Sequence, residues 1–168
     1  PKSLMAILAG GGSIVACVAV LLFLVAVVHD VRTREIPDWV SLAFVVMGLL
    51  VLPHGAWGRL LGAGILFCLF YALWVVGGIG GGDVKLIASS SLLFPPLQQM
   101  WYLLDIALAG GVLAFAYLAL RRWGSTASTA PYGRLLRVEC WRIRRGGPLP
   151  YAVAIFAGFA VTALRGGL

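Results

Sequence analysis

Apolar residues run along this chain in long segments separated by short polar stretches. Six segments can be delimited, at 4–28, 39–52, 60–76, 84–94, 101–120 and 149–164. The first and fifth are long enough to cross a bilayer as helices, which takes about 20 residues. The second and fourth are short for that purpose, because a helix rises only about 1.5 Å per residue. No segment alternates polar and apolar residues over ten positions, so the pattern predicts helices and not a membrane β-barrel.

The composition extends this pattern to the whole molecule. Of the 168 residues, 61% are hydrophobic and only 11% are charged. A soluble domain of this length needs more charge than that to cover its surface. The sequence therefore predicts an all-α, polytopic membrane protein with six transmembrane helices in a single membrane-embedded domain over residues 1–168.

The distribution of basic residues predicts the orientation. With six spans, the polar stretches at 30–38, 77–85 and 121–148 share one side of the membrane, and the remaining loops share the other side with both termini. The first side carries ten Lys and Arg residues, and the second carries three: Lys2, Arg59 and Arg165. Basic loops stay in the cytoplasm. Both termini are therefore expected outside the cytoplasm.

The largest basic stretch, 121–147, is predicted to be a cytoplasmic loop. It contains the amphipathic segment "RLLRVECWRIRR" at 134–145. A basic amphipathic helix binds the surface of anionic lipids. The basic residues lie in membrane-flanking loops, so the lipid bilayer is the expected partner and nucleic acid is not.

Two aspartates are predicted to meet on the cytoplasmic side. Asp30 ends the first apolar segment, and Asp83 begins the fourth after the glycine-rich stretch at 77–82. Either aspartate has a simpler explanation, since Asp is common at helix ends and caps free N–H groups. The glycines indicate close approach of another backbone or a positive φ, with tight helix packing as the alternative.

A pair of carboxyl groups on facing helices can hydrolyse a peptide bond. Close together they do not both ionise, so one holds a proton while the other acts as a base toward water. Asp83, near a helix N-terminus, is expected to be the anion, and Asp30, near a helix C-terminus, to hold the proton. Asp105, in the fifth segment, is expected at the outer interface, with its helix starting nearby.

Other hydrolytic machinery is not recognisable in the sequence. There is no HExxH pattern, and His29 and His54 fall on opposite sides of the predicted membrane. No metal site and no cofactor are therefore expected.

Three motifs resemble one known family. "GGGDVKL", from Gly80 to Leu86, is similar to the GxGD motif of the type IV prepilin peptidases, a family of membrane aspartyl proteases. "HDVRTREIPDWV", at 29–40, resembles that family's first catalytic segment. "PLPYAVAIFAG", at 148–158, resembles its last span, which opens with a Pro-Tyr pair. The motifs occur in the family's order and cover much of the chain.

The resemblance implies that Asp30 and Asp83 are the catalytic dyad of a prepilin peptidase. The substrate would be a prepilin or pseudopilin, whose leader is cut at the cytoplasmic face of the inner membrane, just before a hydrophobic segment. Eight further positions belong to the matching motifs or are suggested substrate contacts: Gly80, Gly82, Lys85, Glu35, Pro37, Asp38, Pro150 and Tyr151.

These further positions have individual expectations. Acidic Glu35 and Asp38 are expected to contact a basic leader. Lys85 is expected either to bias Asp83 toward its charged form or, more commonly for such a lysine, to reach the lipid headgroups. Pro37 and Pro150 are expected to delimit helices. Tyr151 is expected either to hydrogen-bond near the dyad or to anchor its helix.

The chain departs from the family pattern in two ways. Asp38 stands where Asn is usual, and the cysteine-bearing region that bifunctional members associate with N-methylation has no counterpart. The chain therefore resembles the short, peptidase-only members of Flp/Tad pilus systems, and methyl transfer is left open. Two alternatives to a peptidase also remain: a proton- or cation-coupled transporter or channel, and a non-catalytic scaffold that binds pilins.

Overall fold

The structure is a computed structural model that describes residues 2–53, 56–123 and 149–166. Its elements are α1 (Lys2–Thr33), α2 (Asp38–Leu50), α3 (Trp57–Val75), α4 (Gly81–Ser91), α5 (Pro96–Trp123) and α7 (Tyr151–Gly166). There is no strand in these ranges, which confirms the all-α prediction. The predicted amphipathic segment at 134–145 lies outside the described residues.

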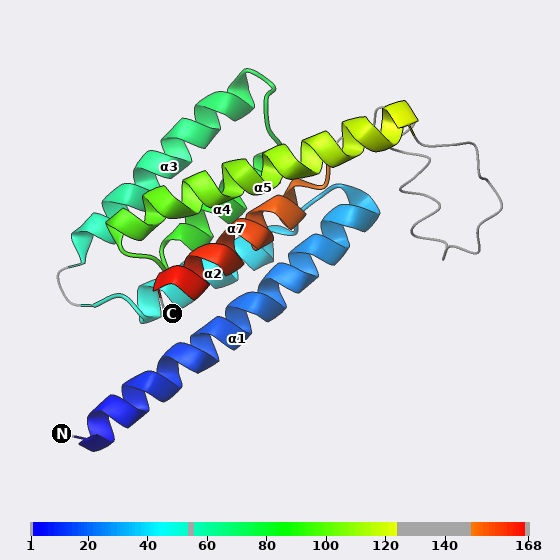
Figure 1. Cartoon of the computed structure of the whole chain (residues 1–168). Coiled ribbons are helices and arrows are strands. Elements are labelled where there is room, and N and C mark those ends of the chain that lie inside the picture. The colour runs from blue at the N-terminus through cyan, green and yellow to red at the C-terminus, as the bar shows by residue number, and fades with distance from the viewer. Residues whose placement is uncertain (1, 54–55, 124–148, 167–168) are drawn as a thin grey trace.

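The helices form a bundle in which successive elements run back and forth (Figure 1). The start of α1 and the end of α7 lie toward the same end of this bundle. α5 packs chiefly against α7, while α4 lies against both α2 and α3. This arrangement brings the end of α1, the start of α2 and the start of α4 to the opposite end of the bundle from the chain termini.

Prolines set several of the helix boundaries. Pro37 has extended backbone dihedrals and precedes the first residue of α2. Pro96 is the first residue of α5, where the missing N–H of proline costs nothing. The pair Pro95–Pro96 therefore separates two helices and does not kink a single one. The expectation that the fifth helix begins near Asp105 was wrong, because α5 begins nine residues earlier and buries Asp105 within its length.

α4 is the central helix of the bundle. Eight of its eleven residues are buried, including all three consecutive serines. The hydroxyl of Ser90 donates to the carbonyl of Leu86 at 2.6 Å and is also 2.8 Å from the Tyr102 hydroxyl. Ser89 and Ser91 donate to carbonyls of the preceding turn. These bonds satisfy the hydroxyl groups in an apolar core, so the serine run is accounted for by folding.

Aromatic rings fill the core around α4. Phe23 of α1, Phe44 of α2 and Phe159 of α7 are fully buried, with ring centroids 4.7–4.8 Å from one to the next. Phe94 and Tyr102 continue the cluster beyond Phe159. Such contacts add to the burial of the rings and fix the packing of α1, α2 and α7.

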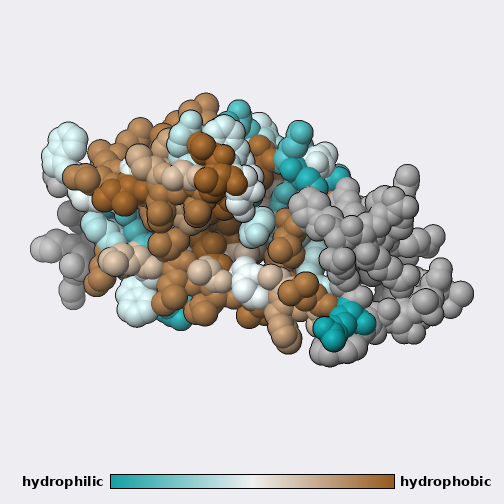
Figure 2. Space-filling model, turned by 90° about the horizontal axis from the view of Figure 1, so that it is seen from above, coloured by the Kyte–Doolittle hydropathy of each residue, from teal (hydrophilic) through white to brown (hydrophobic). Residues whose placement is uncertain are grey.

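The surface of the described residues is largely apolar (Figure 2). Large hydrophobic side chains are exposed on every long helix, for example Leu21 of α1, Ile65 of α3 and Phe115 of α5. Three stretches are long and apolar enough to cross a membrane: Ile14–Thr33, Trp57–Val75 and Pro96–Ala119. The molecule is thus suited to hydrocarbon surroundings, as the composition predicted.

Candidate active site

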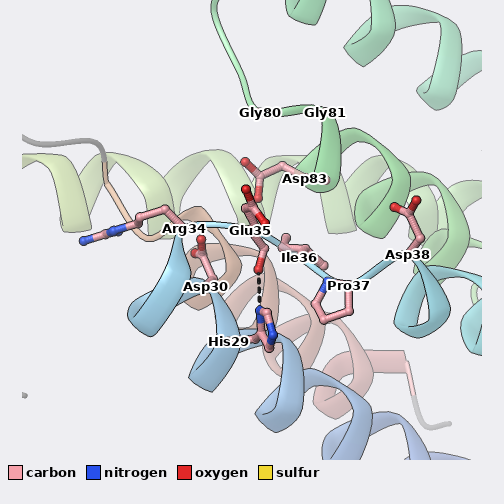
Figure 3. Close-up of a pocket in the computed structure, with 11 residues that line it drawn as sticks. His29, Asp30, Arg34, Glu35, Ile36, Pro37, Asp38, Gly80, Gly81 and Asp83 are labelled. Atoms are coloured by element: carbon pink, nitrogen blue, oxygen red, sulfur yellow. Dashed lines mark hydrogen bonds between the residues drawn. The ribbon is translucent and has the colours of Figure 1, made fainter.

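A pocket of about 510 Å³ opens where α1 ends and where α2 and α4 begin. Its lining comes from two stretches that are far apart in sequence (Figure 3). These stretches supply His29, Asp30, Arg34, Glu35, Ile36, Pro37 and Asp38 from the first, and Gly80, Gly81, Gly82 and Asp83 from the second. The pocket therefore combines two of the three sequence motifs singled out above.

Asp83 is the third residue of α4, and its side chain is turned back toward the start of the helix. The backbone N–H of Gly80, at the N-cap position, donates to its carboxylate. An acidic side chain at this position satisfies a free N–H group of the first turn. A Cβ atom on Gly80 would lie 2.9 Å from Oδ2 of Asp83. Because Gly80 has no Cβ atom, the carboxylate of Asp83 has room to lie beside it.

Gly82 is required by close packing against the loop between α1 and α2. A Cβ atom on Gly82 would lie 3.0 Å from Cβ of Ile36 and 3.4 Å from its backbone nitrogen. Of the alternatives that the sequence left open, close approach of another chain segment applies to Gly82. This contact holds the loop that carries Glu35 and Pro37 against the start of α4.

Asp30 lies one turn before the end of α1 and is only 6% exposed. Its Oδ2 accepts a hydrogen bond from the backbone N–H of Ala152, at 3.1 Å, across 122 residues of sequence. Ala152 is in the first turn of α7, where N–H groups have no partner within the helix. The carboxylate of Asp30 therefore faces a helix N-terminus, as that of Asp83 does.

This contact removes the basis for assigning different charges to the two aspartates. From the sequence, Asp30 was expected beside the C-terminal end of a helix dipole and Asp83 beside an N-terminal end. In the structure, α1 continues to Thr33, and α7 directs its N-terminal end at Asp30. The dipole argument for a negative charge now applies to both residues.

The predicted convergence of Asp30 and Asp83 is observed. Both residues are more than 90% buried, and both line the pocket. Figure 3 shows the two residues presented to the same space from separate helices. Two shielded carboxyl groups in this relation favour a state with one shared proton, which supplies one acid and one base.

Lys85 and Asp38 form an ion pair with each other. Nζ of Lys85 is 2.8 Å from Oδ1 of Asp38, and both side chains are exposed. The pair joins α4 to the first residue of α2, beside the pocket that Asp38 lines. Because it is open to solvent, it contributes at most about 1 kcal/mol to stability. Neither partner was predicted to contact the other.

Glu35 and Pro37 both line the pocket, whereas Pro150 and Tyr151 do not. Pro150 and Tyr151 stand at the start of α7, immediately before the N–H group that binds Asp30. Pro37 and Pro150 both precede helices, as predicted. In the structure the Pro-Tyr pair marks the start of α7, which places the N–H group of Ala152 beside Asp30.

His29 is a pocket residue that the sequence reasoning considered only as a metal ligand. Its Nδ1 lies 2.9 Å from the carbonyl oxygen of Glu35 and 2.9 Å from Oγ1 of Thr33. The Thr33 hydroxyl donates to the backbone carbonyl of His29 at 2.9 Å. This cluster ties the loop after α1 back to the turn that carries Asp30. The only signal in the sequence was the position of His29 next to Asp30.

No group of three or more His, Cys, Asp or Glu side chains within the described ranges is arranged to hold a metal ion. The pocket instead offers carboxyl groups, and Figure 3 shows the side chain of Arg34 extending away from them. Arg34 adopts a φ of 60°, which is uncommon for a residue with a side chain. This conformation turns the chain sharply between α1 and the pocket loop.

Comparison with known proteins points to the same family as the three sequence motifs. A prepilin leader peptidase/N-methyltransferase of Escherichia coli (strain K12) is 31% identical over 117 residues, which are 63% of this chain and 51% of that protein. The enzyme of the same name from Bacillus subtilis (strain 168) is 29% identical over 157 residues, which are 90% of this chain and 55% of that protein. No solved structure gives a significant match.

The chain spans about half the length of these curated relatives. The model of the type IV leader peptidase family matches residues 17–120, which include Asp30, Asp83 and every other residue that lines the pocket. This match covers more than half of the chain and contains the site that the fold assembles. The chain therefore belongs to the type IV leader peptidase family.

Proposed function

We propose that this chain is an aspartic endopeptidase that removes the leader from a type IV prepilin or pseudopilin, of the Flp-like kind. The observation that carries the proposal is the convergence of Asp30 and Asp83, from separate helices, in one pocket. Further support comes from membership of the leader peptidase family and from the names of the two relatives.

In the proposed reaction the two carboxyl groups share one proton. The ionised group takes a proton from water, and the water oxygen attacks the carbonyl carbon of the scissile amide. The protonated group donates to the carbonyl oxygen as the tetrahedral intermediate forms. The group that took the proton from water passes it to the leaving nitrogen. As the C–N bond breaks, the other group takes a proton from a hydroxyl of the intermediate, so that a carboxyl product forms and the pair again holds one proton.

The pocket helps this chemistry by shielding and orienting the carboxyl groups. The N–H groups of Gly80 and Ala152 each hold one carboxylate from the side of a helix N-terminus. Because these donors belong to the backbone, they are preorganised and need no rearrangement during the reaction. The open mouth of the pocket, lined by Glu35 and Asp38, offers acidic contacts for the basic residues of a leader.

The proposed setting is the bacterial inner membrane, with six transmembrane helices, the termini outside the cytoplasm and the pocket at the cytoplasmic face. The back-and-forth course of the helices and the shared end of the two termini support this topology. The ten-to-three distribution of basic residues supports its direction. The short helix α2, which has an exposed apolar face, fits a locally thinned bilayer around the pocket.

The decisive experiment compares the unaltered protein with Asp30→Asn and Asp83→Asn. Asparagine has nearly the same shape as aspartate, but its amide cannot act as an acid or a base, so each variant lacks one member of the pair. Purified protein is mixed with a prepilin in detergent or lipid vesicles, and leader removal is followed by mass spectrometry. We expect each single substitution to lower the cleavage rate by at least about 10²–10⁴-fold.

Two further measurements separate the alternatives. Retention of the thermal unfolding midpoint shows that an inactive Asn variant is folded. Ion flux into vesicles without cleavage by the unaltered protein would favour a transporter or channel, and binding of prepilin without cleavage would favour a scaffold. Full cleavage by either folded Asn variant would show that Asp30 and Asp83 do not act as a catalytic pair.

A further inference from the structure

A second hollow, of about 560 Å³, lies between α1 and α2. It is lined only by apolar residues: Ile14, Val15 and Val18 of α1, and Trp39, Leu42, Ala43, Val46, Met47, Leu50 and Val51 of α2 and its C-cap. We call this hollow the α1–α2 groove. The carboxylate pocket, by contrast, is lined by four acidic residues, one arginine and one histidine among its polar groups.

α2 has two apolar faces, of which only one is used in the fold. Val40, Phe44 and Gly48 face the core and are buried. On the other face, Trp39, Leu42, Val46 and Leu50 follow helical spacing and are each about half exposed or more. Lipid alone is satisfied by any apolar surface, but this face lies beside a hollow with Ala43, a small residue, in its lining.

The groove begins one residue along α2 from the carboxylate pocket. Pro37 and Asp38 line the pocket, and the next residue, Trp39, lines the groove. From Trp39 the groove follows α2 to Val51, a length of about 20 Å for a thirteen-residue helix. An occupant that fills both hollows has a polar, cationic end at the carboxyl groups and an apolar helix along α2.

We propose that the α1–α2 groove is the docking site for the apolar helix of the substrate, so that the peptide bond to be cut is presented from Trp39 into the carboxylate pocket. This inference rests on the proposed function and names the surface that holds the substrate within the membrane. A single segment that crosses hydrocarbon must be an α-helix, because only a helix forms all of its backbone hydrogen bonds within the segment. Seating this helix in the groove fixes the position of the bond beyond its end.

The first test fills the groove and compares two substrates. Ala43→Trp places a large side chain in the lining, while Ile65→Trp adds the same ring to an exposed apolar site on α3 as a control. One substrate is a full-length prepilin, and the other is a soluble peptide with the leader and the cleavage junction but without the apolar segment. We expect Ala43→Trp to raise KM for the prepilin by at least about tenfold. Cleavage of the peptide by Ala43→Trp, and of both substrates by Ile65→Trp, should stay within about twofold of the unaltered protein.

The second test does not depend on the groove being filled or on turnover. The photo-crosslinking residue p-benzoylphenylalanine replaces exposed Val46, or Ile65 as the control, in a background with Asp83→Asn. We expect position 46 to cross-link to the apolar segment of the prepilin and position 65 not to do so.

Several results would overturn the inference. They are an equal loss of both substrates in Ala43→Trp, no loss of either, or cross-links from position 46 only to lipid or to a second copy of this chain. Failure of the proposed function gives a different result, since the unaltered protein would then leave both substrates intact. The cross-linking pattern would still decide whether the groove binds the apolar segment.

Discussion

At the scale of single residues, the pocket depends on backbone groups as much as on side chains. Gly80 holds Asp83 through its N–H group and also leaves room for the carboxylate. Ala152 has no functional group in its side chain, yet its N–H donates a hydrogen bond to Asp30. Such contributions come from the position of a residue in a helix rather than from its side-chain chemistry.

Gly80→Ala should separate activity from stability. Gly80 has dihedrals of −72° and 143°, which alanine adopts without strain, so the fold should tolerate the methyl group. That methyl would lie 2.9 Å from Oδ2 of Asp83, and the flexible carboxyl group would turn away. We expect kcat to fall about 10²-fold, since small displacements of a reacting group are costly. The midpoint of thermal unfolding should stay unchanged.

Gly64→Ala is the matched control for Gly80→Ala. Gly64 lies in α3, and a Cβ atom there has no neighbour within 4 Å. Because alanine favours a helix interior over glycine, Gly64→Ala should stabilise the protein by about 0.5–1 kcal/mol and leave the cleavage rate unchanged. Unaltered cleavage by Gly80→Ala would mean that the carboxylate position does not matter for the reaction.

The sequence could predict the two aspartates because each stands beside a clear boundary. Asp30 precedes a basic loop and Asp83 follows a glycine run, so alternation of the spans was enough to place them together. The donor from Ala152 could not be found in this way, because it depends on how α7 packs against α1. The pairing of Lys85 with Asp38 was missed for the same reason, since it requires the crossing of α4 with α2.

At the scale of helices, α7 is held at both ends. Its first turn binds Asp30, and its last turn binds Asp105 of α5. Oδ2 of Asp105 accepts from the Thr162 hydroxyl at 2.9 Å, and Oδ1 accepts from Arg165 at 2.9 Å. The guanidinium of Arg165 also lies 6.0 Å from the ring centroid of Trp101. This cluster explains a buried carboxylate that the sequence had placed at the outer interface.

Substitutions in the Asp105 cluster should affect stability more than chemistry. Arg165→Ala leaves a buried carboxylate without its cation, whereas Arg165→Lys keeps the charge. We expect Arg165→Ala to destabilise the protein by about 1–3 kcal/mol, a range reduced because the arginine is half exposed. Arg165→Lys should lower the stability less than Arg165→Ala does. Chemical denaturation in detergent measures the change in the free energy of unfolding.

The cleavage rate per folded molecule distinguishes a structural cluster from a functional one. Arg165 is fourteen residues along α7 from the start of that helix, or about 20 Å. Asp105→Asn keeps an oxygen acceptor for Thr162 and serves as the conservative comparison. A large fall in rate without loss of stability in either variant would show that the cluster takes part in the reaction.

At the scale of the whole molecule, the described chain is a helical bundle with apolar outer surfaces and a polar pocket at one end. Three of its helices are long enough to span a membrane, while α2, α4 and α7 are shorter. Sequence hydropathy alone located the six helices of the described residues, and it already marked the second and fourth as short. Of the short helices, α4 is mostly buried in the bundle, whereas α2 keeps one apolar face exposed.

Cysteine labelling tests the proposed topology directly. In a background that lacks Cys17, Cys68 and Cys140, single cysteines are introduced as Arg32→Cys and Trp57→Cys, at exposed positions near opposite ends of the bundle. A membrane-impermeant maleimide added to intact spheroplasts should label position 57 and leave position 32 unlabelled. Permeabilised cells should label both, and the reverse pattern in intact spheroplasts would place the pocket outside the cytoplasm.

The bond between Asp30 and Ala152 has a consequence for biosynthesis. Asp30 is translated early and Ala152 is translated 122 residues later. A nascent chain therefore lacks the hydrogen bond to Asp30 until α7 is inserted. The order of synthesis thereby delays assembly of the complete centre. A truncated product that stops before α7 would retain both aspartates but lack the N–H group that holds the first of them in place.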